Sequence, residues 1–125
     1  MADEPGPTQL HRRAAEQVVT TLRVDVIEGP DRGKNATGDD KLAVGTARDN
    51  ALVVSDFTVS RYHLELAVRP NGVLVTDLGS TNGSYVGGVR IERAVVPTGT
   101  PIKLGGTTIR FSDAERRTVE LDRLV

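Results

Sequence analysis

Apolar and polar residues alternate in short segments along most of this chain. In the segment 22–27, Leu22, Val24 and Val26 are separated by charged residues. A period of two places successive side chains on opposite faces, which predicts a half-buried β-strand. Comparable segments predict further strands at residues 42–45, 52–54, 63–68, 73–76, 84–86, 89–91, 102–104, 107–111 and 118–121.

Turn-forming residues separate these segments. Pro70-Asn71-Gly72 predicts a hairpin that joins segments 63–68 and 73–76, and Gly105-Gly106 predicts a two-residue hairpin before segment 107–111. No segment after residue 20 has helical periodicity. Many short strands with regularly spaced turns predict an all-β sandwich of two antiparallel sheets.

Composition narrows the class of protein. A length of 125 residues fits one domain, and the absence of cysteine excludes disulfides and thiolate metal sites. The chain has 16 basic and 17 acidic residues, without the excess positive charge expected of a nucleic-acid binder. No apolar run reaches the roughly 18 residues of a membrane span, and the polar N-terminus is not a secretory signal. We therefore expect a cytoplasmic domain that binds neither nucleic acid nor membrane.

The chain is expected to divide into three parts. Residues 1–20 contain two of the six prolines and a polar stretch, which predicts a flexible N-terminal tail. Residues 21–122 hold the predicted strands and form the predicted domain. Residues 123–125 would begin a linker to a downstream domain.

Three loops between the predicted strands carry polar chemistry. The first loop spans residues 45–50, the second loop spans 58–63 and the third loop spans 77–84. Together they offer hydroxyl, amide, guanidinium and backbone N–H groups, which are the groups that bind phosphate. Each loop alone is typical of a turn. The order and spacing of all three favour a shared binding site.

The loops resemble those of the forkhead-associated (FHA) family, and the resemblance covers residues 22–111. The matching motifs are Gly45-Thr46, Ser60-Arg61-Tyr62-His63, Gly79-Ser80-Thr81-Asn82-Gly83 and Gly87-Gly88. The resemblance implies an FHA-type β-sandwich with the binding loops at one end. It also implies a phosphothreonine-peptide-binding module that is not an enzyme and needs no cofactor.

The resemblance implies a role for each matching residue. Ser60 and Thr81 would contact the phosphate, Arg61 would add positive charge, and Asn82 would hold the peptide backbone. His63 would brace the second loop from the start of a strand. Positions expected to support the loop backbone are Gly45, Gly83 and Gly88.

Two positions depart from the family pattern. Thr46 stands where the family has an arginine, and Gly87 stands where it has an asparagine. Loss of a charge-assisted hydrogen bond would cost about 1.5–3 kcal/mol of binding free energy. Arg48 lies two residues further along and is a candidate substitute, so both Thr46 and Arg48 belong to the predicted phosphopeptide site.

The motifs also look like the FHA version that precedes the ATPase domain of bacterial enhancer-binding transcription activators, which work with the nitrogen-type sigma factor. This resemblance implies a regulatory module. Its partner would be a phosphothreonine-containing target of a Ser/Thr kinase, or its own downstream domain. The missing arginine favours an alternative, an FHA-fold interaction domain with little or no dependence on phosphate.

Catalytic and metal-binding interpretations fit the sequence less well. Ser60 and His63 suggest a hydrolase pair, but residues three apart at the start of a strand point to opposite faces. The segment 29–35 has glycines and a lysine like a nucleotide-binding loop, with the wrong spacing and no Ser or Thr for magnesium. Two histidines in distant segments and no cysteine argue against a zinc site.

Overall fold

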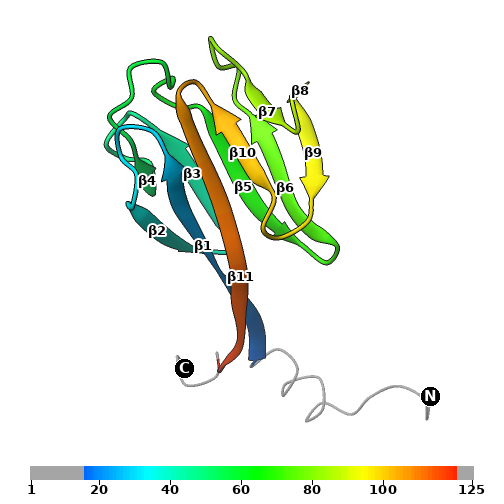
Figure 1. The fold of residues 1–125 in the computed structure, drawn as a ribbon. Helices are drawn as coiled ribbons and strands as arrows, with labels where there is room; N and C mark the ends of the chain where they lie inside the picture. Colours follow the sequence, from blue (N-terminus) through cyan, green and yellow to red (C-terminus); the bar gives the residue numbers. More distant parts are fainter. Residues whose placement is uncertain (1–15, 121–125) are drawn as a thin grey trace, which may run out of the picture.

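Two β-sheets packed face to face make up the fold (Figure 1). The computed structural model describes the backbone of residues 16–120 and the side chains of residues 20–112. One sheet has six strands in the order β2-β1-β11-β10-β7-β8, and the other has five in the order β4-β3-β5-β6-β9. The strands are β1 (Glu16–Glu28), β2 (Asn35–Asp39), β3 (Lys41–Gly45), β4 (Leu52–Val53), β5 (Leu64–Arg69), β6 (Gly72–Asp77), β7 (Ser84–Val86), β8 (Val89–Ile91), β9 (Arg93–Val96), β10 (Pro101–Leu104) and β11 (Thr107–Glu120).

The core lies between the sheets and consists mainly of valine, leucine and isoleucine. Val24 and Phe111 of the six-stranded sheet are fully buried, as are Leu64 and Val75 of the five-stranded sheet. Burying one such side chain stabilises the fold by about 1.5–3 kcal/mol. The alternation in the sequence therefore marks the inner faces of the sheets, and the predicted all-β sandwich is confirmed.

Most of the predicted strands are present, with bounds shifted by a residue or two. The Gly105-Gly106 turn joins β10 to β11, with Leu104 paired to Thr107. One pair of strands differs from the prediction of antiparallel sheets. β3 and β4 run parallel, with Val44 opposite Leu52.

The predicted N-terminal tail over residues 1–20 is too long. Residues 16–20 belong to β1, and their backbone pairs with β11 from Glu16 opposite Glu120 onward. Thr20 is already buried. Residues 1–15 and the predicted linker 123–125 lie outside the described residues.

The strand prediction failed at β2, β9 and β11. β2 and β9 were not predicted, because neither has a regular apolar alternation. β2 lies at the edge of its sheet and has no fully buried position, although its backbone pairs with β1. The separate strands predicted at 107–111 and 118–121 are one strand, β11, described as far as Glu120.

The second loop lies at one end of the sandwich, and the ends of the described chain lie at the other (Figure 1). Backbone hydrogen bonds connect the first loop to the second. Thr46 N–H donates to the carbonyl of Ser60 at 3.1 Å, and Ala47 N–H donates to that of Arg61 at 3.1 Å. The fold thus gathers loops that are distant in the sequence.

Candidate functional site

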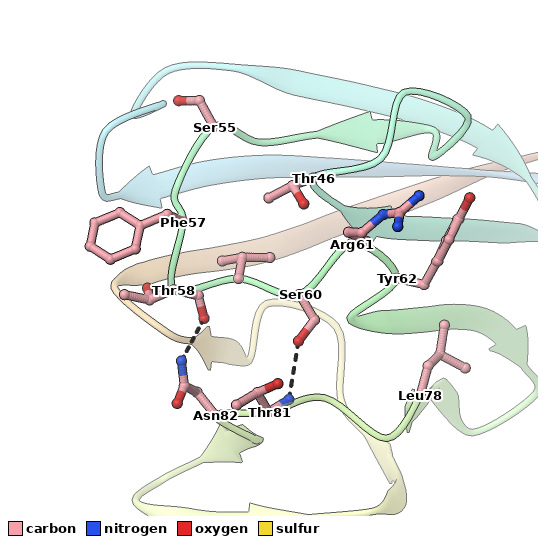
Figure 2. Close-up of a pocket in the computed structure, with 11 residues that line it drawn as sticks. Thr46, Ser55, Phe57, Thr58, Ser60, Arg61, Tyr62, Leu78, Thr81 and Asn82 are labelled. Atoms are coloured by element: carbon pink, nitrogen blue, oxygen red, sulfur yellow. Dashed lines mark hydrogen bonds between the residues drawn. The ribbon is translucent and has the colours of Figure 1, made fainter.

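A groove with a volume of about 800 Å³ opens between the three loops (Figure 2). It is lined by Thr46 of the first loop, by Ser60 and Arg61 of the second, and by Thr81 and Asn82 of the third. Thr46 and Ser60 are half-buried, and the other three are exposed. Hydroxyl, guanidinium and amide groups from separate loops therefore border one space.

Two hydrogen bonds, dashed in Figure 2, join the second loop to the third. The Oγ of Ser60 accepts from the backbone N–H of Thr81 at 3.1 Å, and Nδ2 of Asn82 donates to the carbonyl of Thr58 at 2.9 Å. The Ser60 oxygen acts as an acceptor in this bond, so its own hydrogen can be donated to a ligand. Asn82 likewise keeps its Oδ1, an acceptor suited to a peptide N–H.

His63 connects the same two loops and is fully buried. Its Nδ1 accepts from the backbone N–H of Ser60 at 3.0 Å. The hydrogen of the neutral ring therefore sits on Nε2, which donates to the carbonyl of Gly83 at 2.9 Å. Both ring nitrogens bind backbone groups, so His63 and the Ser60 hydroxyl do not form a hydrolase pair.

Asp77 organises the third loop. Its Oδ2 accepts from the backbone N–H of Ser80 at 2.9 Å, and its Oδ1 accepts from the hydroxyls of Ser80 at 2.6 Å and Ser84 at 2.7 Å. Burial raises the pKa of Asp77, but the hydrogen bonds from Ser80 and Ser84 outweigh this effect, so the pKa lies below its usual value. The carboxylate is therefore ionised at neutral pH and accepts all of these bonds.

A continuous chain of hydrogen bonds runs from Asp77 to the groove. The Oγ of Ser80 also accepts from the backbone N–H of Gly83 at 2.9 Å. The carbonyl of Gly83 binds His63, and His63 binds Ser60. Gly83 has a φ of 85°, a conformation that favours glycine. The third loop thereby sets the position of the backbone that carries Ser60.

The first loop is attached to the second by Asn50 and by a close backbone approach. Nδ2 of Asn50 donates to the carbonyls of Ala47 and Arg61, both at 2.8 Å. A Cβ atom at Gly45 would lie 2.1 Å from the carbonyl oxygen of Arg61. Only glycine fits there without a shift of backbone, which explains the glycine at the start of this loop.

The second loop rests on the turn between β10 and β11. Buried Asp56 accepts from the hydroxyl of Thr58 at 2.6 Å and from that of Thr107 at 2.8 Å. The bond from the Thr58 hydroxyl, with further hydrogen bonds, lowers the pKa of Asp56 despite its burial. The Oγ1 of Thr58 in turn accepts from the backbone N–H of Gly106 at 2.8 Å.

Arg61 is the one cation among the described residues that line the groove. Arg48 is exposed and does not line it. Next to Arg61, the hydroxyl of Tyr62 donates to the carboxylate of Asp49 at 2.9 Å. That hydrogen bond and the charge of Asp49 raise the pKa of Tyr62, which therefore stays neutral at physiological pH.

The structure does not bring every predicted site residue to the groove. Ser60, Arg61, Thr81, Asn82 and Thr46 line it, and Gly45, Gly83 and His63 hold its loops. By contrast, Gly88 lies with Gly87 in the turn between β7 and β8 and borders a separate groove.

The comparison with known proteins agrees with this architecture. The FHA domain-containing protein FhaB of Mycolicibacterium smegmatis is 37% identical over 107 residues, which cover 84% of this chain and 65% of FhaB. The chain thus spans less than two thirds of that relative. The model of the Yop-YscD family, described as the cytoplasmic domain of an inner membrane component of T3SS, matches residues 25–115. The chain belongs to the Yop-YscD cytoplasmic-domain family and is an FHA domain.

Solved FHA domains share its fold. The FHA domain of the CT664 protein from Chlamydia trachomatis has a TM-score of 0.68 and 28% identity, covering 74% of this chain and 97% of that one. A second structure comes from a study of phosphothreonine-dependent FHA domain interactions. It has a TM-score of 0.62 and 27% identity, and the match covers 74% of the present chain and 96% of the solved chain.

The described part of this FHA domain was also compared with the requirements of a membrane-spanning helix and of a metal site. In the described residues, no helix is long and apolar enough to cross a membrane. Within the same part of the chain, no group of three or more His, Cys, Asp or Glu side chains is placed to hold a metal ion.

Proposed function

We propose that this FHA domain binds phosphothreonine-containing segments of partner proteins in the groove between its three loops. The observation that carries the proposal is the convergence of Ser60, Thr81 and Arg61 on one open groove. Ser60 donates its hydroxyl hydrogen to a phosphate oxygen. Thr81 adds a second hydroxyl, and Asn82 accepts from the N–H of the bound peptide.

The hydrogen-bonded loops support this assignment. A phosphate ligand requires several donors at fixed positions, because each bond depends on distance and angle. The chain from Asp77 through His63 fixes the backbone of Ser60 before any ligand arrives. A preorganised site loses less conformational freedom on binding.

The charge of the groove is lower than the family pattern would supply. A phosphothreonine carries about −1.5 to −2 charges at neutral pH, and Thr46 supplies a neutral hydroxyl where an arginine is expected. Arg61 must therefore meet most of that charge, together with backbone N–H groups. We infer that binding is weaker than in FHA domains that keep the arginine.

The wider context is also part of this proposal. The domain would act in the cytoplasm as the N-terminal regulatory part of a bacterial transcription regulator, and its partner would be the target of a Ser/Thr kinase or a domain downstream of residues 123–125. The resemblance of the loop motifs to those of enhancer-binding activators supports this context.

A second function is favoured by Thr46. With one lining cation among the described residues, the same loops would suit a protein partner whose binding does not depend on phosphate. This alternative predicts equal affinity for a peptide and its phosphorylated form.

Calorimetric titration with a peptide selected from a phosphothreonine library, and with its unphosphorylated twin, separates the two functions. We expect only the phosphorylated peptide to bind well. Ser60→Ala should lose about tenfold in affinity, and Arg61→Gln about ten- to hundredfold, because each removes a bond to a charged group. The matched variant Arg48→Gln should change affinity by less than about twofold. Equal binding of both twins by the wild type would establish the alternative.

A further inference from the structure

Large apolar side chains are exposed around the groove. Among the described residues, five large apolar side chains are exposed at the surface, and Phe57, Tyr62 and Leu78 all line this one groove. Phe57 is 93% exposed, Tyr62 46% and Leu78 43%. A single exposed apolar residue is ordinary on a protein surface, but a group of them beside polar residues marks an interaction site.

These side chains stand on opposite sides of the phosphate-binding hydroxyls. In Figure 2, Phe57 lies on one side of Ser60 and Thr81, and Tyr62 and Leu78 lie on the other. A peptide whose phosphothreonine contacts Ser60 would therefore run past an apolar surface in each direction along its chain.

Hydrogen bonds hold the backbone that carries Phe57. Phe57 lies between buried Asp56 and Thr58, which are hydrogen-bonded to each other. The neighbouring Ser55 is tied to Asp31, whose carboxylate accepts from its backbone N–H at 2.7 Å. The backbone on both sides of Phe57 is therefore held by hydrogen bonds, while its ring is exposed.

We propose that the partner of this domain carries apolar side chains on both sides of its phosphothreonine, and that Phe57 reads one side while Leu78 with Tyr62 reads the other. This inference rests on the proposed phosphothreonine function. With Thr46 in place of an arginine, the groove offers little charge, and burial of apolar surface supplies the affinity that charge does not. Covering part of an exposed apolar side chain contributes about tenfold in affinity.

Three phosphothreonine peptides test the proposal. The first has leucine at the three positions on each side of the phosphothreonine. The second has asparagine in place of the three N-terminal leucines, and the third has asparagine in place of the three C-terminal leucines. Each is measured beside its unphosphorylated twin. The wild type should bind the all-leucine phosphopeptide about tenfold more tightly than either asparagine peptide.

Single substitutions then assign each side to a residue. Phe57→Ser should abolish the preference for leucine on one side only, and Leu78→Ser should abolish it on the other. Val95→Ser is the matched control, because Val95 is 44% exposed on β9 and does not line the groove. It should keep both preferences. All three side chains are exposed, so thermal unfolding should confirm that the variants fold like the wild type.

Different results would overturn different claims. Phosphate-dependent binding without a leucine preference, or a preference that survives both Phe57→Ser and Leu78→Ser, would overturn this inference and leave the proposed function standing. Equal binding of phosphorylated and unphosphorylated twins would overturn both. If Phe57→Ser instead converts a dimeric wild type to a monomer without changing peptide preference, the exposed apolar side chains serve self-association, and the inference is wrong.

Discussion

The backbone and the side chain of Ser60 make different hydrogen bonds. The backbone N–H donates to His63, which positions the residue, while the Oγ accepts from Thr81 and leaves the hydroxyl hydrogen for a ligand. Replacing the side chain therefore removes a ligand contact without removing the bond to His63. Ser60→Ala therefore removes the ligand-binding hydroxyl and the acceptor of the Thr81 N–H but keeps the bond to His63, whereas a change at His63 alters the backbone of the second loop.

Thr46 is the residue at which affinity can be increased. Thr46→Arg should strengthen phosphopeptide binding by about ten- to hundredfold, because a guanidinium at the edge of the groove adds a charge-assisted bond to the phosphate. The control is Thr46→Gln, which adds length and a donor without charge and should give little gain. Titration of both variants with one phosphopeptide checks this. An equal gain for both would show that charge is not what this position lacks.

Residue types in the sequence predicted the residues that line the groove better than the residues that support its loops. The order of Ser60, Thr81 and Asn82 along the chain was informative. Asp77 and Asp56 were missed, because aspartate near a strand end is equally typical of an ordinary turn. Their function depends on donors such as Thr107, which is 51 residues from Asp56, and local sequence does not show such pairings.

Among the elements, the turn between β10 and β11 contributes to the groove from outside the three loops. Its backbone supports Thr58, and the fit is tight. A Cβ atom at Gly105 would lie 2.4 Å from the Oγ1 of Thr58 and 2.6 Å from its carbonyl oxygen. The sequence predicted the hairpin at this position but not its contact with the second loop.

Gly105→Ala should therefore reduce both stability and phosphopeptide affinity. Gly99→Ala is the matched control, since Gly99 also has positive φ but a Cβ atom added there would have no neighbouring atom within 4 Å. The control should lose about 1 kcal/mol of unfolding free energy from backbone strain alone. Gly105→Ala should lose more, because Thr58 must move. Urea unfolding and peptide titration measure both effects, and equal losses in the two variants would argue against the contact.

Of the strands that were missed, β2 has no fully buried position and is held by backbone pairing with β1. Its sequence therefore carries no apolar alternation. In β11, the charged residues after Asp113 suggested an interruption. The backbone continues as a strand there because β1 pairs with it. Hydrogen bonding to a neighbouring strand does not require a side-chain pattern.

For the whole molecule, the two supporting aspartates link stability to pH. The pKa values of Asp56 and Asp77 are lowered in the folded state. Such groups stabilise the fold at pH values above their unfolded pKa of about 4, and this contribution is lost as the pH falls through the folded pKa. The domain should therefore lose stability as the pH is lowered from about 5 to 3.

Asp77→Asn tests this link. The variant should be less stable than the wild type by about 2 kcal/mol at pH 7, because it loses charge-assisted hydrogen bonds from Ser80 and Ser84. It should also lose less stability between about pH 5 and 3, because one of the two aspartates with a lowered pKa is gone. Urea unfolding at several pH values gives both numbers. Parallel pH profiles for the two proteins would show that Asp77 does not contribute.

The pairing of β1 with β11 also sets an order of events during synthesis. Glu16 pairs with Glu120, so the six-stranded sheet joins residues from nearly opposite ends of the described chain. Contacts so distant in sequence form slowly, and a ribosome delivers β1 long before β11. The five-stranded sheet needs only residues between 41 and 96 and can assemble earlier. The second loop is hydrogen-bonded to the β10–β11 turn through Thr58 and Gly106. A nascent chain that stops before Gly106 should therefore form the five-stranded sheet but should not bind a phosphopeptide.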